Sequence, residues 1–338
     1  MKILIIGNRA GTHIGGCFEK AALELNHDVQ VLESHVAMAA PFWMRRYYWW
    51  FRGKRPAKLL EFGQAVLAVC QKWKPDYILA TGIAPLDQAI LKKLGALGTY
   101  RINYLTDDPW NSSHRANWFM RALPSYDIIV SVRRTNLEDL YSIGCKKVFY
   151  LPFAYQPNIH FPEEPASLEE KSQLSSDIIF AGGGDIDRVP YITALLQTGV
   201  KVALYGTYWD RFQQTRDHTH GQANISTLRK AITCSKVALC LVRRANRDGN
   251  SMRTFELPAI GACMLVEETQ EHREIFGNNR ECVVYFNGTD QMVDQLKWLL
   301  ENNDERARLK KAAHERITQG HHTYKDRLLT IFEAVNKK

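Results

Sequence analysis

Two acidic residues with a defined spacing mark the most informative stretch of the chain. Asp248 and Glu256 are separated by seven residues, and Gly249 and Asn250 between them have the composition of a loop that leads into a helix. A helix start offers unpaired backbone N–H groups and the positive end of the helix dipole, which suit a phosphate group. The spacing therefore fits carboxylates that hold sugar hydroxyls on either side of a phosphate, with Arg253 adding charge. An ordinary capped helix with solvated charges explains the same spacing.

A glycine-rich turn follows an apolar run. Gly182, Gly183 and Gly184 precede Asp185 and Arg188 in the sequence FAGGGDIDR. Glycine after a strand lets a ligand approach the backbone closely, although a tight turn that needs a positive φ angle has the same composition. The turn lacks the GxGxxG pattern followed about 20 residues later by a ribose-binding acid, which disfavours a nicotinamide site.

Two further apolar runs end in residues that suit a nucleotide. Tyr205 and Gly206 end one run and could lie against a base, and Arg243 ends another and could meet a diphosphate together with Arg244. A tyrosine at the edge of the core and a solvated pair of charges are the alternative interpretations. No group of His, Asp and Glu residues has metal-ligand spacing, so we expect neither a metal nor a bound cofactor.

The segment 42–55 combines rings and positive charge. Seven aromatic and five basic residues occupy its fourteen positions. Tryptophan and tyrosine suit the membrane interface, and each Lys or Arg near an anionic bilayer contributes about 1 kcal/mol, so the segment predicts peripheral membrane contact. The alternatives are a helix that packs its rings into the N-terminal domain, and stacking on sugar rings or on single-stranded nucleic acid.

The elements that must position these residues follow from hydrophobic periodicity. Short runs that are apolar on both faces predict parallel strands covered by helices on each side. The runs are 2–6, 28–32, 76–80, 101–105, 127–132, 147–151, 177–181, 200–205, 236–242, 262–266 and 282–286. Between them lie helical patterns such as 57–73, and at the carboxyl end helices are expected with caps at Thr289 and Asp304 and from about Tyr324.

The size and composition of the chain favour two α/β domains. Its 338 residues exceed the roughly 250–300 that one hydrophobic core supports, and 45% hydrophobic and 24% charged residues are globular values that exclude disorder, collagen and coiled coil. The proline-rich stretch 156–176 has no strand pattern and predicts a linker between domains 1–155 and 177–320, with 321–338 as a final helix. Ligands of such sheets bind beside the strand C-termini.

The net charge and the cysteines of the chain bear on its partners and its cellular location. The net charge of +8 suits a phosphate-rich partner, and no apolar run reaches the roughly 18–20 residues of a membrane span or the core of a signal peptide. The chain has seven cysteines and no CxxC pair, which predicts reduced cysteines in the core. We therefore expect a cytoplasmic protein, peripheral at the inner face of the membrane through 42–55. The cysteines are Cys17, Cys70, Cys145, Cys234, Cys240, Cys263 and Cys282.

The C-terminal half resembles a known family. The stretch RTFELPAIGACMLVEE, the following EIFGNNRE step, the helix DQMVDQLKWLL, the ER-rich helix and HHTYKDR are similar to the group 1 glycosyltransferases of the GT-B fold, nearest to their CgeB-like (spore-maturation-protein-like) branch. The resemblance covers 177–330, and best 235–330. In the N-terminal half it extends only to the strand pattern and TDDPWN (106–111).

The resemblance implies two Rossmann-like, doubly wound domains facing across a cleft, with the last helix crossing back to the N-terminal domain. It implies a transferase that moves a sugar, with retention and without a metal, from a UDP- or GDP-linked donor to a glycan, lipid-linked or other hydroxyl acceptor. Glu256 matches the second acid of the family's E-x7-E motif, on the ribose, and Asp248 replaces the first Glu, near the donor sugar. Arg188 matches the arginine after the first C-terminal strand. The loop and helix start beneath the diphosphate correspond to Gly249, Asn250, Ser251, Met252, Arg253 and Thr254.

The N-terminal half adds candidates at its own strand ends. Gly15 and Gly16 at the first helix could approach the phosphates or sugar of the donor. Asp107 and Asp108 follow a strand, where one of them could act as a base on the acceptor hydroxyl or position the acceptor; the sequence DDP also forms turns. Two other functions remain open: a nucleotide-sugar epimerase on the same fold, and a nucleic-acid or membrane binding module with a degenerate sugar site.

Overall fold

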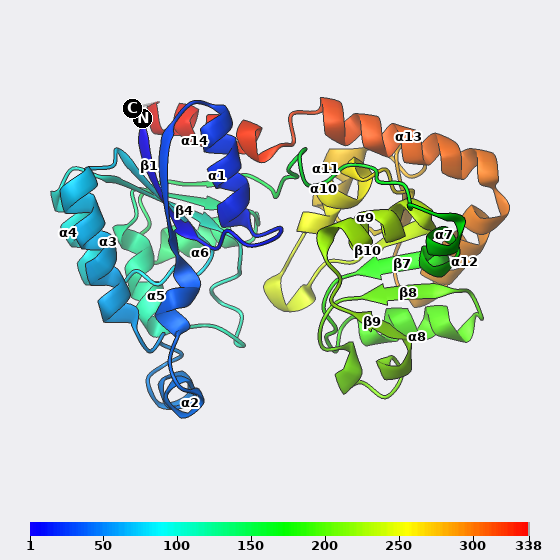
Figure 1. Cartoon of the computed structure of the whole chain (residues 1–338), viewed down its shortest axis with the longest axis horizontal. Coiled ribbons are helices and arrows are strands. Elements are labelled where there is room, and N and C mark those ends of the chain that lie inside the picture. The colour runs from blue at the N-terminus through cyan, green and yellow to red at the C-terminus, as the bar shows by residue number, and fades with distance from the viewer. Residues whose placement is uncertain (337–338) are drawn as a thin grey trace. The chain divides into compact units, whose positions relative to one another are not determined.

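The computed structural model describes residues 1–336 and divides into two compact units, each built on one six-stranded parallel sheet (Figure 1). The first unit contains residues 1–152, the short segment 245–247 and the helix from Tyr324 onward. The second unit contains residues 153–244 and 248–323. The predicted α/β class with two Rossmann-like sheets is therefore confirmed.

The first sheet has the strand order β2-β1-β3-β4-β5-β6. Its strands are β1 (Lys2–Gly7), β2 (Asp28–Glu33), β3 (Tyr77–Thr81), β4 (Tyr100–Leu105), β5 (Ile128–Ser131) and β6 (Val148–Tyr150). The helices of this unit are α1 (Ile14–Glu24), α2 (Phe42–Phe51), α3 (Leu59–Trp73), α4 (Gln88–Ala96), α5 (Asn117–Ala122), α6 (Asn136–Ser142) and α14 (Tyr324–Asn336), with 3-10 turns η1 (Ser34–Met38) and η2 (Leu123–Ser125). The central strands are buried on both faces, as their continuous apolar runs predict.

The C-terminal helix α14 belongs to the first unit. Tyr324 is fully buried, and its ring lies edge-on to that of Phe18 in α1 at 5.2 Å between centroids. Phe18 in turn contacts Tyr104 of β4 at 5.0 Å. Arg327 donates from Nε to the carbonyl oxygen of Pro152 at 3.0 Å. These contacts confirm the prediction that the last helix returns to the N-terminal domain.

The second sheet has the order β12-β11-β10-β7-β8-β9. Its strands are β7 (Ser176–Ala181), β8 (Val202–Tyr205), β9 (Thr219–Gly221), β10 (Ser235–Cys240), β11 (Met264–Glu267) and β12 (Val284–Phe286). Its helices are α7 (Leu168–Leu174), α8 (Val189–Gln197), α9 (Ile225–Cys234), α10 (Met252–Ala259), α11 (Gln270–Phe276), α12 (Thr289–Glu301) and α13 (Asn303–Gln319), with 3-10 turns η3 (Trp209–Arg211), η4 (Arg216–His218) and η5 (Arg244–Asn246).

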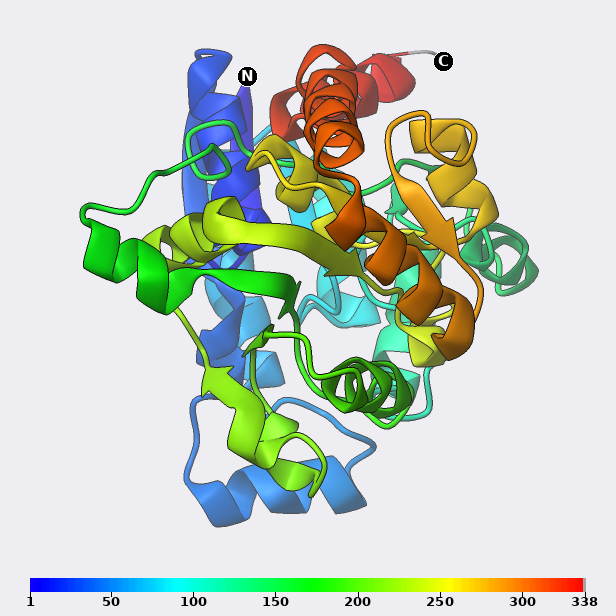
Figure 2. The same ribbon diagram turned by 90° about the vertical axis from the view of Figure 1, so that its right-hand side faces the viewer.

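Helices cover both faces of the second sheet (Figure 2). Ile178 and Phe180 of β7 join a core cluster that also contains residues of α8 and α12. Cys240 of β10 faces the other way, where its Sγ lies 3.8 Å from Oγ1 of Thr254 in α10. Because the strands of this sheet are parallel, the loops at their C-termini lie along one edge of the sheet, which is where ligands of α/β sheets bind.

Two features of the second unit differ from the sequence prediction. Strand β9 is short and polar, so it carries no apolar run and was not predicted. Residues 156–176, predicted as a linker, pack within this unit instead. Their charged side chains form ion pairs there, and some of their apolar side chains are at least partly buried. Glu163 accepts from Arg229 at 2.7 Å, Glu170 accepts from Lys230 at 2.8 Å, and Ile159 is buried.

The seven cysteines carry no disulfide, and six of them are buried. Burial raises the pKa of the Cys17 thiol to about 12 and that of the Cys240 thiol to about 11, which keeps both protonated. Within residues 1–336, no helix combines the length and the hydropathy that crossing a bilayer requires.

Candidate functional site

The candidate site lies at the C-terminal edge of the second sheet. The loops that follow β7, β8 and β10 carry most of the predicted donor-binding residues. Parallel strands bring these loops to the same edge, although they are up to about 70 residues apart in sequence.

The glycines of these loops allow the chain to pack against itself. Gly206 has φ +137°, and a Cβ placed on it would clash with the carbonyl oxygen of Gly182. A Cβ on Gly184 would lie 2.9 Å from the ring of Trp209, whose Nε1 donates to the carbonyl oxygen of Gly182 at 2.8 Å. Contacts within the chain therefore explain Gly184 and Gly206. Gly183 is different, because a Cβ there meets nothing closer than 3.6 Å.

Arg188 is the central charged residue of this edge. The residue is 8% exposed, it donates from Nη1 to the carbonyl oxygen of Gly183 at 3.0 Å, and it lies 3.5 Å from the Asp185 carboxylate. Its guanidinium also lies over the Phe180 ring at 5.5 Å. The buried Nε atom has no hydrogen-bond partner among the described residues. Burial lowers the pKa of Arg188, with Asp185 acting against this and the neighbouring Arg243 reinforcing it. Burial of a guanidinium N–H without a partner is unfavourable, so an acceptor that reached this atom would stabilise the side chain.

Two more arginines surround Arg188. Arg243 places Nε 3.7 Å from Asp185, so one carboxylate is shared by two guanidinium groups. Arg253, in the first turn of α10, donates from Nε to the carbonyl oxygen of Ala181 at 2.7 Å and from Nη1 to the Glu256 carboxylate. Burial lowers the pKa of Arg253 to about 10, and the charge of Arg188 acts in the same direction. We call Arg188, Arg243 and Arg253 the arginine cluster. The following Arg244 instead bonds Glu267 and the Tyr191 hydroxyl.

Glu256 lies beneath the arginine cluster and is 1% exposed. One of its oxygens accepts from Arg253, and Oε1 lies 3.4 Å from Nε2 of His160 without a hydrogen bond from the described residues. The Nδ1 atom of His160 accepts the backbone N–H of Gln156 at 3.0 Å, so a neutral ring carries its proton on Nε2, toward Glu256. A ligand hydroxyl reaches this carboxylate only after a neighbouring side chain moves. His160 was not predicted, because it lies in the stretch interpreted as a linker.

The loop before α10 is fixed by bonds within the second unit. Asn250 and Thr254 are fully buried: Asn250 donates to the Glu271 carboxylate, and Thr254 Oγ1 lies 2.9 Å from His272 Nε2. Burial lowers the pKa of His272 to about 4, so its ring is neutral. The Asn250 amide N–H and Thr254 Oγ1 thus hold the loop, and contact of these two residues with a donor stays a prediction.

The other residues of that loop keep some exposure. Ser251 forms a capping box with Thr254, and Met252 and Asp248 are half-buried. Gly249 is required by packing, because a Cβ there would lie 2.5 Å from the carboxyl carbon of Glu271. Asp248, Gly249, Ser251, Met252 and Arg253 are thus the members of this loop and helix start that keep some exposed surface.

The ring of Tyr205 is buried and packs against His220. The two rings stack at 4.9 Å between centroids with an interplanar angle of 23°. His220 is the exposed partner of this stack. A base that approaches from solvent meets His220 before it meets Tyr205.

The predicted residues of the first unit are used mainly by its own structure. A Cβ on Gly15 would lie 2.8 Å from backbone atoms of Asn8, and one on Gly16 would lie 2.5 Å from the carbonyl oxygen of Arg9. The N–H of Gly16 already donates to the carbonyl oxygen of Asn8 at 3.0 Å. The tight packing of α1 on its preceding loop accounts for both glycines, and their approach to a donor stays a prediction.

Asp108 is a buried ion-pair residue. Its carboxylate accepts from Arg247 at 2.6 Å, from Asn136 at 2.9 Å and from the Trp110 N–H at 3.0 Å. Burial raises the pKa of Asp108, but these three hydrogen bonds together outweigh it and leave the pKa below its ordinary value. A carboxylate that is this well paired is a poor general base, which disfavours that role for Asp108, whereas positioning of the acceptor by one of the two aspartates stays a prediction. Asp107 is half-buried and accepts from its neighbour Thr106 at 3.1 Å.

No triplet of His, Cys, Asp and Glu side chains gathers as a metal-binding group within the part of the chain that the structure describes.

The comparisons with known proteins agree with this architecture. Residues 189–333 match the model of a family described as "Glycosyl transferase-like". The fold is GT-B. It is shared with the sucrose-phosphate synthase of Thermosynechococcus elongatus, at a TM-score of 0.70 and 11% identity over 99% of both chains.

Two other solved structures share the fold. Anabaena HepE in complex with UDP has a TM-score of 0.60 and 11% identity over 99% of this chain and 100% of HepE. A putative UDP-N-acetylglucosamine 2-epimerase from Listeria monocytogenes has a TM-score of 0.57 and 14% identity over 100% of this chain and 96% of its own. No curated protein sequence matches the chain significantly.

The two glycines Gly206 and Gly183 should respond differently to alanine. Gly206→Ala forces a side chain into a positive φ angle and against a backbone oxygen, and we expect it to lower the free energy of unfolding by roughly 2–5 kcal/mol. Gly183→Ala should cost less than about 1 kcal/mol, because its Cβ makes only ordinary van der Waals contacts, none closer than 3.6 Å. Urea denaturation of both variants measures the difference. Equal losses would show that the loop packing described here is wrong.

Asp108 and Asp107 form a second matched pair. Asp108→Ala removes the partner of Arg247 and Asn136 and should lower the free energy of unfolding by roughly 2–4 kcal/mol at neutral pH, whereas Asp107→Ala should change it by less than about 1 kcal/mol. Because the pKa of Asp108 is lowered on folding, its contribution is present above the ordinary carboxyl pKa and is lost as the pH falls through the folded value. The difference between the wild type and Asp108→Ala should therefore shrink in acid, and a difference independent of pH would contradict this assignment.

Proposed function

We propose that this protein is a glycosyltransferase that moves a sugar from a nucleotide-diphosphate sugar to an acceptor hydroxyl. The observation that carries the proposal is the arginine cluster, in which the buried Arg188 presents an Nε–H without a partner at the C-terminal edge of the second sheet. The matched region 189–333 includes Arg243 and Arg253 of this cluster and also Glu256.

The arginine cluster suits a diphosphate better than any neutral ligand. Arg188 lowers the pKa of Arg253, Arg243 lowers that of Arg188, and a single carboxylate, Asp185, lies against Arg188 and Arg243. An anion bound here relieves the repulsion among the three cations and supplies an acceptor to Arg188 Nε. In the transfer reaction the same cations stabilise the charge that develops on the departing diphosphate, around an oxocarbenium-like sugar.

The acids around the cluster fit the remaining parts of a donor. Glu256 Oε1 is a buried acceptor without a hydrogen bond from the described residues, which suits a ribose hydroxyl once a side chain moves aside. Asp248 is half-buried just before α10 and is assigned to the donor sugar. His220, stacked on Tyr205, offers a ring to the base. Gly183 and Met252 complete the donor-facing set.

The structure of the first unit bears on the chemistry of the acceptor. Asp108 is held as an ion pair, so Asp107 is the better candidate to position the acceptor hydroxyl. A reaction that proceeds with retention and transfers the acceptor proton to the leaving phosphate needs no enzyme base, and we assign that course to this chain. Charge neutralisation by arginine makes a metal unnecessary in this scheme.

The proposed nucleotide, sugar and acceptor rest on the similarity of this chain to other proteins. HepE, which shares the fold, binds UDP in its solved structure, and this favours a UDP-linked donor over a GDP-linked one. A hexosyl group and membership in the CgeB-like branch are proposed from the motif RTFELPAIG and the segments after it. A glycan or lipid-linked molecule is the proposed class of acceptor.

Arg188→Ala tests the diphosphate contact. The variant should bind UDP about 10–100-fold more weakly than the wild type, because a charge-assisted hydrogen bond to phosphate contributes roughly 1.5–3 kcal/mol. Isothermal titration calorimetry with UDP and GDP measures the change. Arg308→Ala removes an exposed arginine of α13 and is the matched control, expected to bind like the wild type. Equal affinity of Arg188→Ala and the wild type would refute the role of the arginine cluster.

Incubation with donor tests the class of reaction. With UDP-sugar and an acceptor mixture, we expect transfer that EDTA changes by less than about twofold, because arginines carry the neutralising charge. With UDP-sugar alone, we expect no new sugar isomer by NMR. An isomer formed without acceptor would identify the protein as an epimerase instead, the function named for the Listeria structure that shares its fold. Loss of transfer in EDTA, restored by a divalent cation, would contradict metal independence.

A further inference from the structure

The helix α2 exposes an unusual number of aromatic rings. All ten of its residues are at least partly exposed, and Phe42, Trp50 and Phe51 are 66%, 68% and 78% exposed. Side chains of this kind are normally among the most buried in a protein. A contiguous exposed group of them marks an interaction surface.

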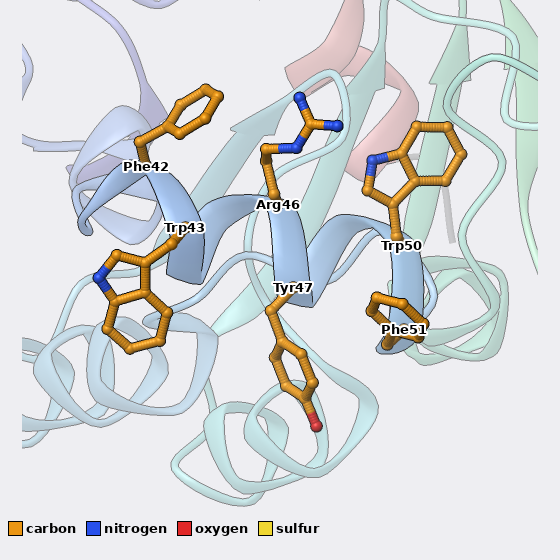
Figure 3. Close-up of a pocket in the computed structure, with 6 residues that line it drawn as sticks. All are labelled: Phe42, Trp43, Arg46, Tyr47, Trp50 and Phe51. Carbon is orange, nitrogen blue, oxygen red and sulfur yellow. The ribbon is translucent and has the colours of Figure 1, made fainter.

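The rings form two adjacent rows along one face of α2. Phe42, Arg46 and Trp50 are spaced by four residues, and so are Trp43, Tyr47 and Phe51. These six side chains line one shallow hollow on the surface (Figure 3). On the opposite face, Met44 and Tyr48 are half-buried. We call the six residues of the two rows the aromatic face.

The C-terminal end of α2 is attached to the body of the first unit. The carbonyl oxygen of Lys54 accepts from Trp118 Nε1 at 3.3 Å, and the ammonium group of Lys54 donates to the carbonyl oxygen of Ser112. The same ammonium group lies 5.8 Å from the ring centroid of Trp49. The helix that carries the aromatic face is therefore attached to the first unit through Lys54, just after its C-terminal end.

The charged residues of the chain segment that contains α2 have one sign. Arg45, Arg46, Arg52, Lys54 and Arg55 lie on or directly after the helix, and the sequence has no Asp or Glu between Glu33 and Glu61. Arg46 lies over the Phe42 ring at 5.5 Å, so its charge sits at the edge of the rings. A partner must therefore accept both apolar rings and positive charge.

We propose that the aromatic face is the surface by which this protein docks on an anionic lipid bilayer. The rings enter the boundary between headgroups and acyl chains, where tryptophan and tyrosine are favourable, and the cations bind lipid phosphates. The aromatic face contains a single cation, Arg46, among five rings. A single-stranded nucleic acid needs cations that follow its backbone beside the stacked bases, so the pattern favours the bilayer. The proposal is independent of the proposed transfer reaction.

Co-sedimentation of the full-length protein with vesicles tests this docking. The wild type should sediment with phosphatidylcholine vesicles that contain about a third phosphatidylglycerol, and far less with pure phosphatidylcholine. The variant Trp43→Ser/Trp50→Ser/Phe51→Ser should lose at least about tenfold in partition coefficient. The variant Arg45→Gln/Arg46→Gln/Arg52→Gln should lose about 100-fold, since each cation contributes about fivefold.

Matched controls remove the same kinds of side chain elsewhere. Leu97→Ser/Leu168→Ser removes exposed apolar residues, and Lys92→Gln/Lys93→Gln/Lys311→Gln removes three exposed cations. Both controls should sediment like the wild type, and the thermal midpoints of all variants should agree because every substituted residue is at least partly exposed.

Three outcomes would overturn the docking proposal. The first is that the wild type does not sediment with anionic vesicles at low salt. The second is an equal loss in the α2 variants and their controls. The third is that oligothymidine or a second copy of the chain occupies the surface, seen as oligonucleotide binding tighter than vesicle binding or as a dimer that the aromatic variant dissociates.

Discussion

The account depends on a positive charge that the fold holds partly out of water. Arg188 is buried beside Arg243 and Arg253, and the loop supplies it with one carbonyl oxygen and one carboxylate. Burial lowers the pKa of both Arg188 and Arg253, which means that the folded chain destabilises these cations relative to water. A bound anion removes this penalty, so the second unit is prepared for a charged ligand by its own electrostatics.

The rest of the second unit keeps that charge in place. The glycine turn can reach Arg188 because Gly206 and Gly184 let the neighbouring loops touch, with Trp209 bonded beneath them. The start of α10 is held by Asn250 and Thr254, which bond inward to Glu271 and to His272. Thus many residues near the site act by fixing the loops, and a smaller number face outward with unused hydrogen-bonding capacity.

The strands could be predicted from the sequence, whereas the hydrogen-bond partners of the site residues could not. Buried parallel strands need continuous apolar runs, and the eleven predicted runs correspond to strands, whereas the polar three-residue β9 carries no such signal. Helix α12 (Thr289–Glu301) begins one residue earlier than its predicted cap at Thr289 allows. Its N-cap is Gly288, at φ +84°. Spacing singled out Arg188, Arg253 and Glu256, whose contacts with a donor stay predictions. It could not show that the Asp108 carboxylate and the Asn250 amide N–H bind internal partners, nor that His160 lies against Glu256.

A structure of the protein with a bound nucleotide diphosphate tests the central claim most directly. The account predicts phosphate oxygens within hydrogen-bonding distance of Arg188 Nε and of at least one of Arg243 and Arg253, with a ribose hydroxyl on Glu256. It is contradicted if the nucleotide binds away from the C-terminal edge of the second sheet, or if Arg188 Nε still lacks an acceptor when the nucleotide is bound.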